Sequence, residues 1–145
     1  MKMAIPFERS FKAKTYFILN ESSIEKDELE ILAFFSLAMD HLNIGDDVSK
    51  SLKKRLSGIF KNDTVSCFLL GQLARNDKYP DGIDGKEILD NAISILLRAQ
   101  RLIGGRFVRV DCKDVKGLLR FYQENGFSIL PEKRDEYWQL VRLLR

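Results

Sequence analysis

Residues 69–89 read LLGQLARNDKYPDGIDGKEIL, and this stretch decides the fold because a strand, a loop and the start of a helix follow one another in it. Residues 64–74 predict a strand, inside which Gly71 indicates a bulge or a close backbone approach. The loop beyond it is rich in Asp, Gly and Pro, and the apolar spacing that follows predicts a helix over Gly85–Ile103. This order of elements is typical of α/β folds.

The start of that helix has two interpretations. Backbone N–H groups converge at a strand–loop–helix turn, and the helix dipole adds about half a positive charge there, which favours a phosphate. Alternatively, Asp84 caps the helix and Glu87 completes a capping box. Residues 75–87 carry three basic and four acidic side chains, and the net negative charge opposes a bound anion. The local sequence slightly favours the capping interpretation.

The flanking segments predict a sheet with helices. Residues 15–20 and 31–39 predict an antiparallel hairpin, and the second segment is apolar enough for a strand covered on both faces. Residues 47–60 predict an amphipathic helix with a basic face. The expected apolar stripe of the helix over Gly85–Ile103 consists of Ile88, Ala92, Ile95, Leu96, Ala99 and Ile103, and Gly104–Gly105 ends it.

The C-terminal segments complete the predicted sheet. Residues 106–112 alternate as a strand, and residues 117–125 predict a helix that Gly126 ends. Residues 127–130 and 137–144 predict two strands joined by the charged turn PEKRDE, with the terminal VRLLR as an edge strand. We therefore expect an α/β (mixed α+β) fold. Its mixed central sheet would begin with an antiparallel hairpin and continue through strand–loop–helix units with helices on both faces.

Composition limits the class of protein. The chain has 145 residues, 45% of them hydrophobic and 31% charged, with a formal net charge of +3, as expected of one soluble globular domain. Cys67 and Cys112 lie in apolar runs, which predicts packing residues in a reducing compartment, and no metal site is expected. Because we find neither a signal peptide nor an apolar run of membrane-spanning length, we expect a cytoplasmic protein with no membrane partner.

Three segments carry a resemblance to a known family. LLGQLARNDKY…GKEIL, RFVRVDCKD and LLRFYQENGF occur in this order and resemble the GNAT superfamily of acetyl-CoA-dependent N-acetyltransferases over roughly residues 13–144. The resemblance is nearest to small bacterial members that include toxins acetylating aminoacyl-tRNA. It implies an acyltransferase that uses acetyl-CoA and transfers acetyl to a primary amine in a ternary complex. The acceptor would be a small molecule, a protein or an aminoacyl-tRNA, and an antitoxin would be a further partner.

The resemblance also implies a shortened N-terminus. Residues 1–145 would form a single GNAT-like acetyltransferase domain that lacks the usual first strand and leading helices. Those helices form much of the acceptor-side wall in the family. A second copy of the chain or another protein would cover this side, or the acceptor site would be open.

Cofactor contacts are implied along the strand end and the loop. Backbone groups at Leu73 and Arg75 would bind the pantetheine arm, and an N–H there would polarise the acetyl carbonyl. Asp81 and Ile83 stand where the family has glycines, unless Gly82 compensates in a shifted register. The residues expected to hold the cofactor are Leu73, Ala74, Arg75, Lys78, Gly82, Ile83, Asp84, Gly85, Lys86 and Phe121.

Tyr122 matches the tyrosine of the family's Phe-Tyr pair. The resemblance implies that it protonates the leaving thiolate of coenzyme A, and a phenol with a pKa near 10 is protonated at neutral pH. Taken alone, Tyr122 is better explained as a half-buried helix aromatic beside Phe121, and the surrounding FYQENGF motif shifts the balance to the acid role. No general base is evident. The residues considered for that role are His41, Asp40, Asp111 and Asp114.

Two features leave the function open. A basic cluster made of Lys50, Lys53, Lys54, Arg55 and Lys61 would contact an RNA backbone or form a solvated helix face. The nearby Asp46, Asp47 and Asp63 favour the solvated face. Because the loop is acidic and the N-terminal elements are missing, the alternative to an enzyme is a catalytically impaired GNAT-like binding or regulatory module, or a truncated remnant. Trp138 is expected in the core or in an interface.

Overall fold

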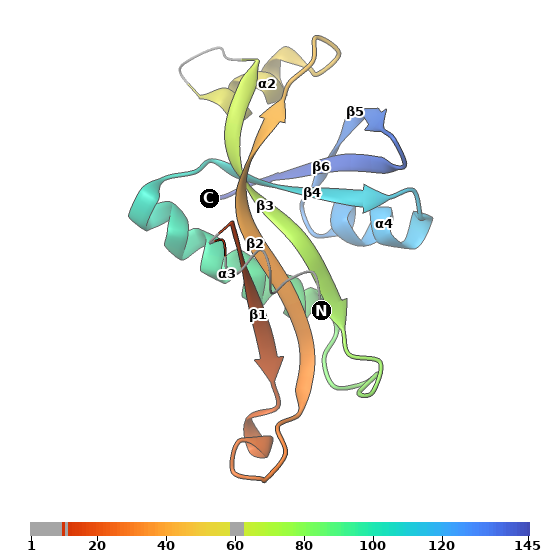
Figure 1. Ribbon diagram of the computed structural model, residues 1–145. Coiled ribbons are helices and arrows are strands. Elements are labelled where there is room, and N and C mark those ends of the chain that lie inside the picture. Colours follow the sequence, from red (N-terminus) through yellow and green to blue (C-terminus); the bar gives the residue numbers. More distant parts are fainter. Residues whose placement is uncertain (1–9, 11, 59–62) are drawn as a thin grey trace. The chain divides into compact units, whose positions relative to one another are not determined.

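The structure is a computed structural model that describes residue 10 and residues 12–58 and 63–145. Within that part, six strands form one mixed sheet in the order β1-β2-β3-β4-β6-β5, which confirms the predicted fold class (Figure 1). The elements are β1 (Ala13–Leu19), the 3₁₀ turn η1 (Glu21–Ser23), β2 (Ile31–Asn43), α2 (Lys50–Ser57), β3 (Thr64–Arg75), α3 (Gly85–Ile103), β4 (Phe107–Lys113), α4 (Lys116–Glu124), β5 (Ser128–Arg134) and β6 (Tyr137–Leu143).

The chain divides into two compact units. We call Met1–Ala38 with Leu70–Ile95 the hairpin unit, and Met39–Leu69 with Leu96–Arg145 the C-terminal unit. β2, β3 and α3 each contribute residues to both units. Among the described residues, no helix is long and apolar enough to cross a membrane.

In the hairpin unit, β1 and β2 form the predicted antiparallel hairpin. Ala13 lies opposite Ala38, and the register shifts between Ile18 and Leu19. The polar turn between the strands is fixed by Ser23, whose fully buried Oγ donates to Asn20 O at 2.6 Å and accepts from Glu30 N at 3.0 Å.

β2 is covered more tightly on one face than on the other. Burial alternates along the strand, because successive side chains of a strand point to opposite faces. Ala33, Phe35 and Leu37 are buried, and the residues between them are half-buried. The close cover of the first face ends at Met39, which follows in the same alternation and is 54% exposed.

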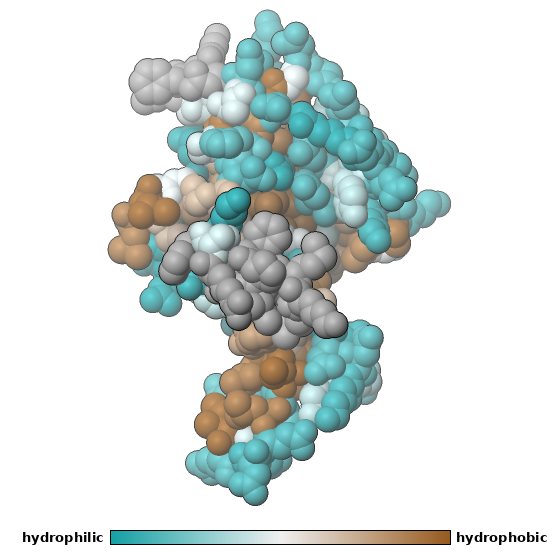
Figure 2. All heavy atoms as spheres, viewed as in Figure 1, coloured by the Kyte–Doolittle hydropathy of each residue, from teal (hydrophilic) through white to brown (hydrophobic). Residues whose placement is uncertain are grey.

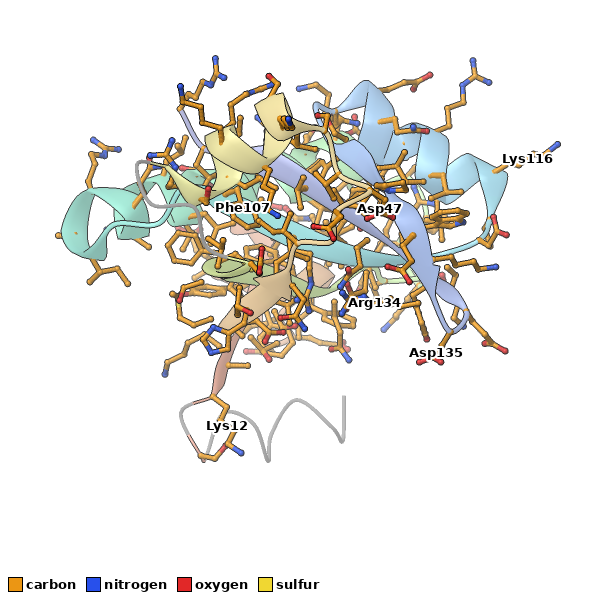
Figure 3. The ribbon with its side chains drawn as sticks, turned by 90° about the horizontal axis from the view of Figure 1, so that it is seen from above. Lys12, Asp47, Phe107, Lys116, Arg134 and Asp135 are labelled. Atoms are coloured by element: carbon orange, nitrogen blue, oxygen red, sulfur yellow. The ribbon has the colours of Figure 1, made fainter. Side chains whose placement is uncertain are left out.

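In the C-terminal unit, β4 and β5 each pair antiparallel with β6. On β4, Phe107, which is labelled in Figure 3, belongs to one core cluster with Leu56 of α2. Cys112 lies close enough to Tyr122 of α4 to raise its pKa. Because these two β4 positions are five residues apart, they point to opposite faces, and helices cover both faces of this unit as predicted. Cys67 and Cys112 are buried free thiols, which confirms their packing role.

The helix predicted over residues 47–60 is shorter in the structure. α2 begins after Ser49, whose side chain accepts a hydrogen bond from Leu52 N at 3.2 Å, and it ends at Gly58 with φ of 75°. The serine cap and the left-handed glycine set these limits. Residues 59 and 60, and Lys61 of the basic cluster, lie outside the described residues.

The expectation of a PEKRDE turn and a C-terminal edge strand is wrong. Most of PEKRDE belongs to β5, and the turn is formed at Asp135, which has φ of 53° and lies at the tip of the β5–β6 hairpin (Figure 3). β6 lies between β4 and β5, so β5 is the edge strand. Pro131 is tolerated there because an edge strand at a register shift, here between Ile129 and Lys133, does not need every backbone donor.

α3 has the predicted bounds, and its end follows the predicted mechanism. Gly104 and Gly105 both adopt positive φ, 84° and 121°. The expected stripe is wrong at its last member, since Ile103 is 71% exposed beside Leu102 at 83%. Figure 2 shows apolar atoms gathered at this end of α3.

Candidate functional site

The last residues of β3 and the loop after them lie in the hairpin unit. Leu73 and Ala74 are half-buried and Arg75 is exposed. Asn76 fixes the start of the loop, because its backbone N donates to Leu32 O at 2.8 Å and its Nδ2 donates to Ile31 O at 2.7 Å. The loop is therefore attached to the first residues of β2.

Gly71 confirms the predicted close approach within β3. A Cβ at this position would lie 2.9 Å from Ser36 Oγ of β2, closer than real Cβ contacts come. Glycine thus lets the neighbouring side chain sit against the strand backbone a few residues before the expected pantetheine contacts at Leu73 and Arg75.

The middle of the loop is formed by successive turns. Lys78 N donates to Asn76 Oδ1 at 3.0 Å, Tyr79 N donates to Asn76 O at 3.0 Å, and Gly82 N donates to Tyr79 O at 3.0 Å. A Cβ at Gly82 would lie 2.8 Å from Leu32 Cδ2 and 3.2 Å from Tyr79 O, so a side chain here would push the end of Leu32 aside and crowd the turn. Ile83, at 7% exposure, anchors the end of the loop in the core.

An open hollow of about 430 Å³ lies beside this loop, and Lys78, Tyr79 and Gly82 are among the residues that line it. Lys78 is largely exposed, with its Nζ 3.8 Å from Glu28 Oε1 and 5.7 Å from the centre of the Tyr79 ring. Such exposed pairs are weak, so the ammonium group is available to an anion.

The start of α3 is capped by a carboxylate. Asp84 Oδ1 accepts a hydrogen bond from Glu87 N at 2.9 Å, which confirms that Asp84 is the helix cap. Lys86 Nζ lies 2.8 Å from Asp90 Oδ2 on the exposed face of the helix. The structure thus brings Lys78, Gly82, Ile83, Asp84, Gly85 and Lys86 together in one loop and helix start, with an acidic side chain on the helix N-terminus.

Tyr122 is buried in the C-terminal unit, at 7% exposure. Its ring contacts Phe121 and Phe127 edge to face, with centroid distances of 5.1 and 5.3 Å. Burial raises the pKa of Tyr122 to about 12, and Cys112 adds to the effect. The phenol is therefore protonated over the whole neutral range and can act only as a proton donor there.

The end of α4 fixes the position of Tyr122. Phe127 N donates to Tyr122 O at 3.0 Å, and Asn125 Nδ2 donates to Phe121 O at 2.8 Å. Gly126 has φ of 89°, as the glycine-ended helix predicts. Two of the expected site residues, Phe121 and Tyr122, thus share this helix end, while the others lie in the hairpin unit.

Two of the residues considered as bases converge on an arginine that the sequence analysis missed. Arg109 is 7% exposed, and its Nη2 donates to Asp40 Oδ2 at 2.8 Å. Its Nη1 donates to His41 O at 2.6 Å, and its Nε lies 3.1 Å from Asp111 Oδ1. The signal that would have found this arginine is its position in RFVRVDC, two residues from both Phe107 and Asp111 on one strand face.

The electrostatics of this cluster argue against a strong base. Burial raises the pKa of Asp40, but the His41 N–H and the Arg109 guanidinium outweigh it and leave the pKa lower than usual. His41 is exposed, and Asp114 pairs with Lys133 at 3.1 Å. Burial also raises the pKa of Cys67 to about 11, so this thiol is not a nucleophile at neutral pH.

No protein-family model and no curated protein matches the chain. Solved structures do match the chain. AtaT complexed with acetyl-methionyl-tRNAfMet is 17% identical, with a TM-score of 0.73, over 94% of this chain and 75% of that chain. AtaTR bound with AcCoA is 18% identical, with a TM-score of 0.69, over 94% and 74%. A KacT variant with phenylalanine in place of one tyrosine is 14% identical, with a TM-score of 0.72, over 94% and 75%. The chain therefore has the fold of the AtaT and KacT structures.

Proposed function

We propose that the chain is an acetyl-CoA-dependent N-acetyltransferase that acetylates a primary amine by direct attack in a ternary complex. The observation that carries the proposal is the fold shared with AtaT, whose structures include one bound with AcCoA and one with acetyl-methionyl-tRNAfMet. A buried, protonated tyrosine at the position expected for the acid supports it.

The hairpin unit would hold the cofactor. Backbone groups at Leu73 and Arg75 bind the pantetheine arm, and an N–H at this strand end stabilises the oxyanion of the attacked thioester. The backbone N–H groups of Lys78, Tyr79 and Gly82 already donate within the loop, so the N–H of Gly85 at the start of α3 would face the pyrophosphate. The exposed ammonium of Lys78 supplies the positive charge that the acidic loop otherwise lacks. Backbone donors do not depend on the side chain, so Asp81 and Ile83 in glycine positions do not remove them.

The C-terminal unit would supply the acid. The amine nitrogen attacks the acetyl carbon, the carbon–sulfur bond breaks, and Tyr122 gives its proton to the departing thiolate so that coenzyme A leaves as a neutral thiol. The amine loses its own proton to water, since Asp40 is held as a weak base by Arg109. Deprotonated Tyr122 regains its proton readily, because its pKa is about 12.

Aminoacyl-tRNA is the acceptor class that we propose. Its support is the AtaT structure that contains acetyl-methionyl-tRNAfMet. The test is calorimetric titration of the chain with acetyl-CoA, followed by measurement of released thiol with methionyl-tRNA, free methionine and uncharged tRNA. We expect micromolar affinity for acetyl-CoA and thiol release with methionyl-tRNA alone. Thiol release with free methionine at the same rate would exclude tRNA as the determinant of the acceptor.

A binding or regulatory module is the second candidate function. The carboxylate of Asp84 on the first turn of α3 favours it, because this negative charge occupies the end of the helix that would receive pyrophosphate. No detectable heat at millimolar acetyl-CoA would establish the module and exclude the enzyme.

A further inference from the structure

The C-terminal unit contains a second hollow, of about 160 Å³, away from the tyrosine and the aspartates described above. Six residues line it: Arg55, Gln100, Arg106, Leu143, Leu144 and Arg145. Half of them are arginines and none is acidic. A concave site with this composition offers guanidinium groups to an oxyanion.

Hydrogen bonds to backbone carbonyl groups hold the hollow in shape. Arg106 Nε donates to Arg55 O at 3.0 Å, at the last turn of α2. Gln100 Nε2 donates to Gly105 O at 2.7 Å and to Leu144 O at 2.9 Å, and Leu144 N donates to Arg106 O at 2.9 Å. The end of α2, the start of β4 and the end of the chain's last strand are thus tied together around the three arginines.

The three guanidiniums have no acidic counterpart. In the part of the chain that the structure describes, the ion pairs of this unit engage other cations, such as Lys53 with Asp63, and none involves Arg55, Arg106 or Arg145. Like charges gathered at one surface repel one another, and a bound anion removes that cost. Asp63, the acidic residue that pairs with α2, therefore neutralises Lys53 rather than Arg55.

We propose that this hollow binds a backbone phosphate of RNA. Its volume corresponds to about five water molecules at ~30 Å³ each, enough for one phosphate group. The exposed Lys50 and Lys54 continue the positive charge along α2, as a polyanion requires. The choice of RNA over other phosphates rests on the proposed function, in which the acceptor is an aminoacyl-tRNA.

The test is binding of uncharged tRNA to the full chain, measured by fluorescence anisotropy. The salt concentration is varied between roughly 50 and 200 mM, a range over which the number of phosphate contacts determines the fall in affinity. Arg55→Gln and Arg145→Gln should each weaken binding about 3- to 10-fold and reduce the salt slope by about 1. The matched control is Lys116→Gln at the exposed start of α4, which also removes one positive charge from this unit.

An equal loss in the control, or no loss in either arginine variant, would overturn the proposal. Duplex DNA of similar length that binds as tightly, with the same loss in both arginine variants, would overturn the assignment to RNA. The proposed acetyl transfer fails separately, since absence of acetyl-CoA binding in the calorimeter leaves tRNA binding by these arginines intact.

Discussion

The hairpin unit and the C-terminal unit differ in where they keep their functional groups. In the hairpin unit, Arg75, Lys78, Asp84 and Lys86 are exposed. The loop depends on a hydrogen bond that Asn76 donates and on one that Asp84 accepts. In the C-terminal unit, Tyr122 and Arg109, which pairs with Asp40 and Asp111, are both at 7% exposure. Substitutions in the loop can therefore test ligand binding alone, whereas those in the C-terminal unit also change packing and need matched controls.

The largest effect is expected at the end of α3. A Cβ at Gly105 would lie 2.3 Å from Phe68 Cε2, and Gly105 also has φ of 121°. Because both overpacking and backbone strain act here, Gly105→Ala should lower the free energy of unfolding by about 3 kcal/mol or more in a urea titration.

The control for that change is the neighbouring glycine. Gly104 has φ of 84° but nothing within 4 Å of an added Cβ, so Gly104→Ala should cost about 1 kcal/mol, from backbone strain alone. Equal losses at the two positions would show that Phe68 does not contact the backbone of Gly105. Backbone strain alone would then account for both losses.

The next effect tests the acid in the C-terminal unit and rests on the proposed function. Tyr122→Phe removes the phenolic proton and keeps the ring that contacts Phe121 and Phe127, so turnover should fall about 100-fold while acetyl-CoA affinity stays the same. Because the pKa of Tyr122 is about 12, the tyrosine should not cause an alkaline loss of activity below about pH 10.

Tyr137→Phe is the matched control, since Tyr137 is 40% exposed at the start of β6 and loses the same hydroxyl. Unchanged turnover in Tyr122→Phe, or the same decrease in both variants, would reject the assignment of Tyr122 as the acid.

The sequence predicted the local parts of both units well. The bounds of α3 follow from apolar spacing and from two glycines, which are local signals. The exposure of Ile103 was missed because periodicity does not show where the packing surface ends. The interior place of β6 was missed because strand order depends on pairings that no single segment encodes.

The candidate site was predictable to a different degree in each unit. The Asp84 cap follows from residues 84–87, whereas the ion pair of Arg109 joins residues 69 positions apart and could not be read from either strand. The roles given to Tyr122 and to the loop come from the family resemblance. The arginine hollow was missed because its three arginines come from three separate segments.

A smaller effect should appear in the pH dependence of stability, through the ion pair of Asp40 with Arg109. The pKa of Asp40 is lowered in the folded chain, so its charged form stabilises the fold above the unfolded pKa of about 4, and this contribution is lost as pH falls through the lower folded value. The wild type should therefore lose stability below about pH 4 more steeply than Asp40→Asn. The side chain is 39% exposed, which limits the difference to below about 1 kcal/mol.

Urea titrations between about pH 3 and pH 7 measure this difference across the unfolded pKa. Asp46→Asn, which changes an exposed aspartate in the same unit, is the control and should follow the wild type. An Asp40→Asn profile as steep as that of the wild type would show that Arg109 does not hold this carboxylate.

The smallest effect is expected in the hairpin unit, where ligand binding can be changed without loss of stability. Asp84→Asn keeps a side-chain oxygen for the hydrogen bond from Glu87 N, because asparagine caps helices as well as aspartate does. It also removes the negative charge that opposes pyrophosphate at the start of α3, so acetyl-CoA should bind about 2- to 5-fold more tightly in the calorimeter. Asp27→Asn, which changes an exposed aspartate between β1 and β2 in the same unit, is the control and should change the affinity less. Weaker binding in Asp84→Asn would mean that the carboxylate assists the cofactor, and the separation of stability from binding in this unit would then fail.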